Sequence, residues 1–356
     1  MTTTRFDKVI GTGGIGVGLL FETDDNRTLG RNESRLVTLS DAKDYCKQHI
    51  VLYYAAVLLS GVAQVYPVGC VGCDANGDKL LSEMVSAGMS VQYVERDETL
   101  PTTISCCLQY PDKDGCNFTS QNGAGVRVTS ENIQNALTAI GVDQRTVLAV
   151  IPEVSVEARV KMLSEGRIMG GYCTLSVPES EVDAFERVGA FRYCNLLTVN
   201  EREALALAPG NGDDPEALTL RLYAKLSQDN PDAALVVTCG KRGAYTLLNG
   251  RIEFVPPLLA EVINTTGAGD AFWGGILAGL ALGFPLQKGR NDRFFGDSEI
   301  TSAAELGSLC AGMAVESADS IAYHVHPMSI LERISSNHWH LSPQFEDYFK
   351  SMRRTE

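Results

Sequence analysis

A glycine-rich turn followed by an apolar helix constrains the fold of this 356-residue chain more than any other segment. The run from Asn264 to Gly275 reads Asn-Thr-Thr-Gly-Ala-Gly-Asp-Ala-Phe-Trp-Gly-Gly, and apolar residues continue to Leu282. Gly267 and Gly269 allow a sharp turn in which consecutive backbone N–H groups point at one spot. That spot lies at a helix N-terminus, where unpaired N–H groups and the helix dipole favour an anion. The run therefore predicts an anion-binding turn.

A carboxylate, Asp270, stands at the mouth of this predicted anion site. Like charges repel, so a carboxylate is a poor choice for a site that only binds phosphate. It suits phosphoryl transfer, in which the carboxylate takes a proton from the attacking hydroxyl. The N–H groups of Gly267, Ala268 and Gly269 then hold the charge on the moving phosphoryl group. The alternative is a glycine-rich turn in which Asp270 is an ordinary helix cap. We predict that Asp270 is a general base.

The run resembles the second signature of the ribokinase/PfkB family of carbohydrate kinases, whose usual form is Asp-Thr-Thr-Gly-Ala-Gly-Asp-x-Phe. The resemblance implies ATP-dependent phosphotransfer to an alcohol group of a sugar or sugar-like small molecule, with ATP and Mg²⁺ as cofactors. A nucleoside kinase is one alternative. A non-catalytic nucleotide- or metabolite-binding protein on the same fold is another. The retained Gly-Ala-Gly-Asp run argues against the second alternative, because a binding protein needs no base there.

The rest of the chain alternates strands with helices, most regularly from Ser130 to Thr238. Such alternation implies a mostly parallel sheet covered on both faces. β-rich excursions at about residues 17–40 and 90–120 interrupt it and read as a small lid. This order resembles the ribokinase-like α/β layout that the family resemblance implies, with a mostly parallel central sheet flanked by helices and a small β-lid. We expect a kinase domain over 1–330 and a C-terminal extension over 331–356.

A short polar motif, Asn200-Glu-Arg-Glu203, follows the strand-like segment 196–199. Residues three apart share one face of a helical turn. The motif resembles the N-x-x-E motif of the family, which implies that Asn200 and Glu203 bind ATP-associated Mg²⁺ through its water shell. The alternative is a capping pair, with Asn200 at the N-cap and Glu203 three residues later.

A second turn, Thr238-Cys-Gly-Lys-Arg-Gly243, ends another strand and resembles the T-x-G-x-x-G turn that lies along the triphosphate in the family. Gly240 and Gly243 permit close approach of the backbone to phosphate oxygens. Thr238, these two glycines and Thr266 are therefore expected to bind the nucleotide. The alternative is a hairpin turn, because residues 244–248 read as a strand, and both interpretations are compatible.

The substrate end of the chain departs from the family pattern. Members usually carry an aspartate that binds sugar hydroxyls near the first strand, and here Gly16 stands in its place. A Gly-Gly-x-x-x-Asn stretch is replaced by the segment 44–49. Other polar contacts are offered by Asp44, Lys47, Gln48 and His49 in this segment and by Asp41 just before it. Because a hydroxyl-binding site needs its polar groups paired, these changes argue against simple ribose or fructose as the acceptor.

One further departure concerns the monovalent cation that activates many family members. Asn264 stands where the family usually has an aspartate beside that cation site. The departure argues against activation by K⁺.

Charge and hydropathy limit the classes of partner that we expect for this chain. The net charge of −14 argues against a nucleic-acid partner, because such binding rests on Lys and Arg. The longest apolar run, 50–65, is interrupted by Ser60, Gly61 and Gln64 and is too short to span a membrane. We expect a small-molecule partner and a cytoplasmic location, and the exposed edges of a β-lid favour pairing of two chains.

Two other patterns are typical of other functions: a glycine run of the kind found in dehydrogenases and a C-x-x-C of the kind found in redox proteins. Gly11, Gly13 and Gly16 match the G-x-G-x-x-G dinucleotide fingerprint, but the sequence that follows reads as an extended hairpin instead of a helix. Cys70 and Cys73 form a C-x-x-C with no second pair at zinc spacing. The ten cysteines are scattered, several of them in apolar runs, and we expect reduced, mostly buried thiols.

Overall fold

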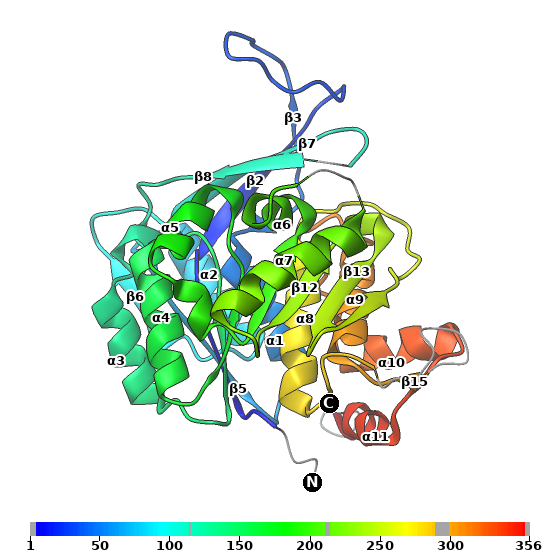
Figure 1. Ribbon diagram of the computed structural model, residues 1–356. Coiled ribbons are helices and arrows are strands. Elements are labelled where there is room, and N and C mark those ends of the chain that lie inside the picture. The colour runs from blue at the N-terminus through cyan, green and yellow to red at the C-terminus, as the bar shows by residue number, and fades with distance from the viewer. Residues whose placement is uncertain (1–4, 114, 211–213, 289–298, 353–356) are drawn as a thin grey trace.

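The computed structural model describes residues 5–113, 115–210, 214–288 and 299–352. Within them, one large α/β body carries a smaller β-sheet and a projecting arm on one side (Figure 1). No helix among these residues combines the length and the apolarity needed to cross a membrane. The expected 1–330 and 331–356 ranges include residues outside the described part, among them the last four of the chain.

The central sheet has the strand order β14-β13-β12-β11-β10-β9-β1-β5-β6. Neighbours from β12 to β6 run parallel, and β13 and β14 are added antiparallel at one edge. Its members are β1 (Lys8–Thr12), β5 (Gln64–Gly72), β6 (Tyr93–Asp97), β9 (Thr146–Val150), β10 (Tyr172–Leu175), β11 (Leu196–Asn200), β12 (Ala234–Thr238), β13 (Ala244–Leu248) and β14 (Arg251–Val255). The carboxyl ends of the parallel strands meet at one edge of this sheet, where ligands bind in open α/β folds.

Helices cover both faces of the sheet because its central strands are apolar on both sides. In β9, Val147 and Ala149 join one core, and Leu148 and Val150 join the other. The first core contains α1 (Lys47–Leu58), α2 (Ala75–Ser86), α8 (Ala268–Leu282) and α9 (Ala303–Ala314). The second contains α3 (Ser130–Ile140), α4 (Val156–Ile168), α5 (Val182–Arg187), α6 (Glu201–Leu207) and α7 (Pro215–Asp229). This arrangement is the mostly parallel, helix-covered sheet predicted from the sequence.

The C-terminal part of the described chain packs onto the first core. It comprises α10 (Pro327–Ser336), α11 (Pro343–Met352) and a parallel pair, β15 (Glu299–Ile300) and β16 (His340–Leu341). The hydroxyl of Tyr348 donates to the carbonyl of Leu58 at the end of α1, over 2.8 Å. Short 3₁₀ turns complete the elements: η1 (Ala124–Arg127), η2 (Glu179–Glu181), η3 (Ala190–Tyr193) and η4 (Gly240–Arg242).

A second sheet, which we call the lid sheet, has the order β3-β2-β7-β8, with β4 also paired to β2. Its strands are β2 (Gly16–Glu22), β3 (Thr38–Leu39), β4 (Asp44–Tyr45), β7 (Thr103–Gln109) and β8 (Gly115–Thr119). One detail differs from the expected lid range of 90–120. Residues 93–97 form β6, which pairs with β5 in the central sheet, because the apolar side chains of Tyr93 and Val94 pack there.

The two faces of the lid sheet differ in character. Strand register places Leu19, Cys106 and Phe118 in one row, and on this outer face Leu19 and Phe118 are exposed. The opposite, inner face carries polar and small side chains, including those of Asp44, Ser105, Cys107 and Gln109 together with Gly16 and Gly18. The inner face is buried against the rest of the molecule.

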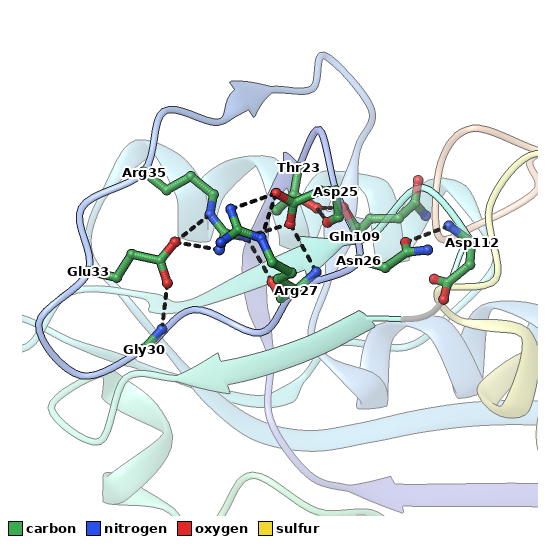
Figure 2. Close-up of polar contacts among 9 residues, drawn as sticks. All are labelled: Thr23, Asp25, Asn26, Arg27, Gly30, Glu33, Arg35, Gln109 and Asp112. Carbon is green, nitrogen blue, oxygen red and sulfur yellow. Dashed lines mark hydrogen bonds and ion pairs between the residues drawn. The ribbon is translucent and has the colours of Figure 1, made fainter.

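An arm of residues 23–37 projects from the lid sheet, as Figure 1 shows at the top of the molecule. Figure 2 shows the charged network that orders it. The guanidinium of Arg35 donates to Asp25, Glu33 and the carbonyl of Arg27. At the base of the arm, Thr23 donates its backbone N–H to the carbonyl of Gln109 on β7.

Candidate active site

The glycine-rich turn forms the N-terminus of α8, as its sequence predicted. Gly267 is the N-cap, with a φ of 81°, and a Cβ there would lie 2.4 Å from the carbonyl oxygen of Ser320. Only glycine fits that position. A Cβ built on Gly269 would meet no atom within 4 Å among the described residues, so this side of the turn faces open space. The turn is thus shaped to admit a ligand at the helix N-terminus.

The backbone N–H groups of the turn are differently engaged. The N–H of Ala268 donates to the carbonyl of Thr265 over 3.3 Å. Within the described part of the chain, the N–H groups of Gly267, Gly269 and Asp270 have no hydrogen-bond acceptor of their own. These three groups are available to an anion.

Asp270 lies in the first turn of α8, beside a lysine from another helix. The Nζ of Lys47 is 4.0 Å from Oδ1 of Asp270. Burial raises the pKa of Asp270, the Lys47 charge opposes that rise, and the Asp44 charge adds to it. In turn, the Asp270 charge raises the pKa of Lys47, against the effect of burial. Lys47 therefore favours the ionised carboxylate that a general base requires.

Glu153 is a site residue that the sequence analysis did not identify. It follows β9, has a φ of 78°, and accepts the backbone N–H of Lys47 over 3.0 Å. A Cβ on Gly14 would lie 2.5 Å from its Cβ, so that glycine makes room for it. Burial raises the pKa of Glu153 to about 7, against the opposing charge and N–H of Lys47. The sequence signal was present: an acidic residue a few positions beyond an apolar parallel strand lies at the ligand-binding edge.

Asn200 and Glu203 form a reciprocal capping box at the start of α6. Glu203 accepts the backbone N–H of Asn200, and Asn200 accepts that of Glu203, each over 2.9 Å. The capping interpretation is therefore present in the structure. Burial raises the pKa of Glu203, and the nearby charge of Lys47 opposes the rise. Glu203 thus lies within electrostatic reach of the lysine that contacts Asp270.

The Thr238–Gly243 turn lies next to this capping box. Register pairs Thr238 at the end of β12 with Asn200 at the end of β11. Gly240 and Gly243 have φ values of 54° and 86°, and a Cβ on Gly240 would meet no described atom within 4 Å. Gly243 is forced to be glycine, because its Cβ would lie 2.4 Å from the carbonyl oxygen of Val255. The open side of Gly240 permits the close approach expected for a phosphate-binding turn.

Asn264 makes three side-chain hydrogen bonds at the entrance to the α8 turn. Its Oδ1 accepts Nε2 of Gln109 over 2.7 Å and the backbone N–H of Thr266 over 2.9 Å. Its Nδ2 donates to the carbonyl of Ala318 over 2.8 Å. The hydroxyl of Thr265 donates to the carbonyl of Lys113, on the lid side of the turn, over 2.5 Å. These contacts join the lid sheet to the turn that carries Asp270.

Comparison with known proteins agrees with this geometry. The model of the pfkB family carbohydrate kinases matches residues 47–325. The chain belongs to the pfkB family of carbohydrate kinases. A ribokinase of Schizosaccharomyces pombe is 28% identical over 231 residues, which is 63% of this chain and 69% of that protein. An adenosine kinase of the same yeast is 26% identical over 60% of this chain and 67% of its own length.

Solved structures share the fold. A ribokinase structure from Giardia lamblia superposes with a TM-score of 0.76 at 17% identity, covering 92% of this chain and 98% of that one. The pfkB-family kinase described here is thus an ATP-dependent sugar kinase with the ribokinase-like fold predicted from its sequence.

The polar residues expected near the acceptor, in and just before the segment 44–49 of this pfkB-family kinase, lie in different surroundings. His49 is fully buried against the ring of Tyr45, and burial lowers its pKa to about 3, which leaves it neutral. Gln48 is buried and donates to the carbonyl of Gly11. Asp41 is exposed. Lys47 lies beside Asp270, and Asp44 lies on the inner face of the lid sheet.

The remaining sequence patterns have structural explanations in this kinase. The 11–16 glycine fingerprint leads into β2, so no helix N-terminus follows it to receive a pyrophosphate. All ten cysteines lie in the described part of the chain and are unpaired. Among the described residues, no group of three or more His, Cys, Asp or Glu side chains could hold a metal ion.

Proposed function

We propose that this pfkB-family kinase transfers the γ-phosphoryl group of ATP to a hydroxyl of a sugar or sugar-like acceptor, with Asp270 as the general base. The observation that carries the proposal is the position of Asp270. Its carboxylate shares one helix N-terminus with N–H groups that have no described acceptor, and it lies 4.0 Å from the ammonium of Lys47. A base, an anion site and a cation therefore meet where a phosphoryl group would move.

Each group in this cluster has a defined task. Asp270 removes the proton from the attacking hydroxyl, and its raised pKa makes it a stronger base than an exposed aspartate. The N–H groups of Gly267, Gly269 and Asp270 stabilise charge on the phosphoryl oxygens. The N–H of Ala268 is partly engaged with Thr265, so its contribution is smaller than the sequence suggested.

Asn200 and Glu203 fit Mg²⁺ only through its water shell. One oxygen of each side chain is occupied by the capping box, which leaves the second oxygen of Glu203 for a water ligand. Mg²⁺ keeps several waters and takes few protein oxygens, so this donor set suits it. When bound with ATP, the ion would neutralise phosphate charge. Thr238, Gly240, Gly243 and Thr266 are proposed to line the nucleotide site.

A nucleoside is the second candidate acceptor. The match to an adenosine kinase supports it, over nearly the same share of the chain as the match to a ribokinase. The reacting centre would be the same in both cases, because each reaction places a hydroxyl beside Asp270.

A second copy of the chain is the proposed protein partner. The outer face of the lid sheet exposes an apolar row that includes Leu19 and Phe118, and water would be released if a partner covered it. Unpaired cysteines fit the reducing cytoplasm that we propose as its location.

The test of the proposed function is ADP release from Mg-ATP across a panel of sugars, polyols, sugar phosphates and nucleosides. We expect at least one acceptor class to stimulate release. Asp270→Asn should lower that rate by about a hundredfold or more, while ATP binding measured by calorimetry changes little. An active Asp270→Asn enzyme would remove the assigned base. ATP binding without release for any acceptor would favour the non-catalytic binder.

A further inference from the structure

The absence of a side chain at Gly16 has a steric cause. A Cβ on Gly16 would lie 2.4 Å from the carbonyl oxygen of Thr103 and 2.8 Å from Sγ of Cys46. The first contact is with the backbone of β7, the neighbouring strand of the lid sheet, which cannot move without breaking the β2–β7 pairing. This chain therefore has no room for an acceptor-binding aspartate at position 16.

A different carboxylate lies across the same strand. Asp44 on β4 pairs with Gly18 on β2, and a Cβ on Gly18 would lie only 2.0 Å from Oδ2 of Asp44. The carboxylate of Asp44 thus occupies the space that a side chain on β2 would fill. Gly16 and Gly18 together clear the inner face of β2 for a side chain that arrives from β4.

The hydrogen bonding of Asp44 is incomplete. Its side chain is buried, with 4% of the residue surface exposed. Among the residues that the structure describes, Oδ2 accepts the thiol of Cys107 alone, over 3.0 Å, and a thiol is a weak donor. Oδ1 has no hydrogen-bond partner within the described residues. A buried carboxylate oxygen without a donor is costly, so this geometry points to a ligand that supplies the donor.

The position of Asp44 relative to the reacting centre is also informative. The Asp44 charge adds to the burial of Asp270 in raising its pKa, so the two carboxylates are electrostatic neighbours. Gln109, on the same inner face, bonds Asn264 at the entrance to the α8 turn. The inner face of the lid sheet therefore borders the space in front of Asp270, on the side where an acceptor would enter.

We propose that Asp44 is the specificity-determining carboxylate of the acceptor site, where its Oδ1 accepts a hydroxyl of the acceptor other than the one that is phosphorylated. This inference rests on the proposed kinase function and adds the residue and the acceptor class. The acceptor must carry at least two hydroxyl groups, one for Asp270 and one for Asp44.

The charges of the site define the acceptor class further. The charges of Asp270, Glu203 and Glu153 act on Lys47, the charge of Asp44 acts on Asp270, and among the described residues Lys47 is the cation that pairs with Asp270. A carboxylate or phosphate on the acceptor would be placed among these acidic groups without a free cation in the cluster. The acceptor class is therefore a neutral polyhydroxylated molecule, and sugar acids and sugar phosphates are excluded.

Calorimetry on the Asp270→Asn protein tests acceptor binding without turnover. The probes are neutral sugars, polyols and nucleosides in one arm, and ribose 5-phosphate and gluconate in the other. We expect a neutral probe to bind and the two anionic probes to bind at least about tenfold more weakly. Adding Asp44→Asn to this protein should weaken binding of the neutral probe by about tenfold to a hundredfold, because a hydrogen bond to a charged group is lost.

A matched control is Asp143→Asn, which removes one carboxylate at the amino end of β9, at the opposite edge of the sheet. It should leave acceptor binding unchanged. In the otherwise wild-type enzyme, Asp44→Asn should raise the KM for the acceptor by a similar factor and leave the KM for ATP within about twofold. Circular dichroism and melting temperature establish that each variant is folded.

Three results would overturn the assignment: unchanged binding in the Asp44→Asn protein, tighter binding of an anionic probe, or binding of no neutral probe. Failure of the proposed function has a different signature. Neutral probes would then bind and depend on Asp44, while the wild-type enzyme would release no ADP with any of them.

Discussion

At the scale of single residues, Glu153 governs how the site responds to pH. Its pKa is raised by burial to about 7, so between its ordinary value of 4.5 and about 7 the folded chain holds a proton that the unfolded chain has released. Stability contributed by this group is therefore present at low pH and is lost as pH rises through about 7. Asp270 and Glu203 also have raised pKa values and act in the same direction.

A variant whose side chain at position 153 cannot ionise should lose this pH dependence. We expect Glu153→Gln to flatten the decline in unfolding free energy between pH 5 and 8, by on the order of 2–3 kcal/mol. The amide oxygen of glutamine can still accept the N–H of Lys47, so the fold should be kept. Urea unfolding of both proteins at several pH values measures the effect. Parallel curves would show that Glu153 ionises normally.

Part of this candidate site could be predicted from the sequence, and the rest could not. The Asp270 turn was predictable because a helix N-terminus, two glycines and a carboxylate are all local to one segment. The approach of Lys47 to Asp270 was not, since these residues are more than two hundred positions apart and meet only through packing of α1 on α8. Asp44 was one of five polar candidates near the start of α1, and the features that distinguish it, its pairing with Gly18 and its unpartnered Oδ1, are visible only in the structure.

At the scale of elements, the loop that enters α8 is fixed by an amide where the family usually has a carboxylate. Both Asn264 polar atoms are engaged, with Oδ1 accepting from Gln109 and Thr266 and Nδ2 donating to Ala318. The carbonyl of Ala318 therefore already has its donor in Asn264. Because these hydrogen bonds already engage the side chain of Asn264, we expect the loop to hold its shape without a monovalent cation.

We predict that the initial rate of ADP release is the same within about twofold in potassium, sodium and tetramethylammonium buffers. Asn264→Asp should lower the unfolding free energy by about 1–3 kcal/mol in tetramethylammonium buffer, because an aspartate oxygen cannot donate to the carbonyl of Ala318. Denaturant unfolding in the three buffers measures this cost. Strong activation of the wild-type enzyme by K⁺ alone would contradict this account of the loop.

Element boundaries show the same division between local and tertiary information. The strands and helices from 130 to 238 were predicted from their periodicity, because each has a clear apolar pattern and polar or glycine-containing ends. Residues 93–97 were placed in the lid, since a short strand between turns has no signal for its partner. Pairing with β5 is a tertiary choice that is made by the packing of Tyr93 and Val94.

At the scale of the whole molecule, the inner face of the lid sheet is buried against the candidate site, and its outer face is exposed. Leu19, Cys106 and Phe118 lie in one row on the outer face, and 63% of the Phe118 surface is exposed. The arm adds Leu36, which is 93% exposed, beside the same sheet. The charged network of Figure 2 orders the arm, which projects from the body in Figure 1, and these apolar side chains are exposed.

A second copy that covers this face would bury the apolar row and the edges of the lid strands together, which favours a symmetric dimer. We predict that light scattering at micromolar concentration gives twice the 38.4 kDa chain mass. Phe118→Asp should shift the protein toward the monomer, because a dimer would then bury a charge without a partner.

Ile168→Asp is the control for this prediction. Ile168 is 73% exposed at the end of α4, away from the lid sheet, so this variant should remain dimeric. A wild-type monomer at these concentrations, or equal masses for wild type and Phe118→Asp, would show that the outer face has no partner of its own kind. Because Asp44 lies on the inner face of the same sheet, on β4 beside β2, loss of the dimer should also raise the acceptor KM, and the two readouts can be compared in one variant.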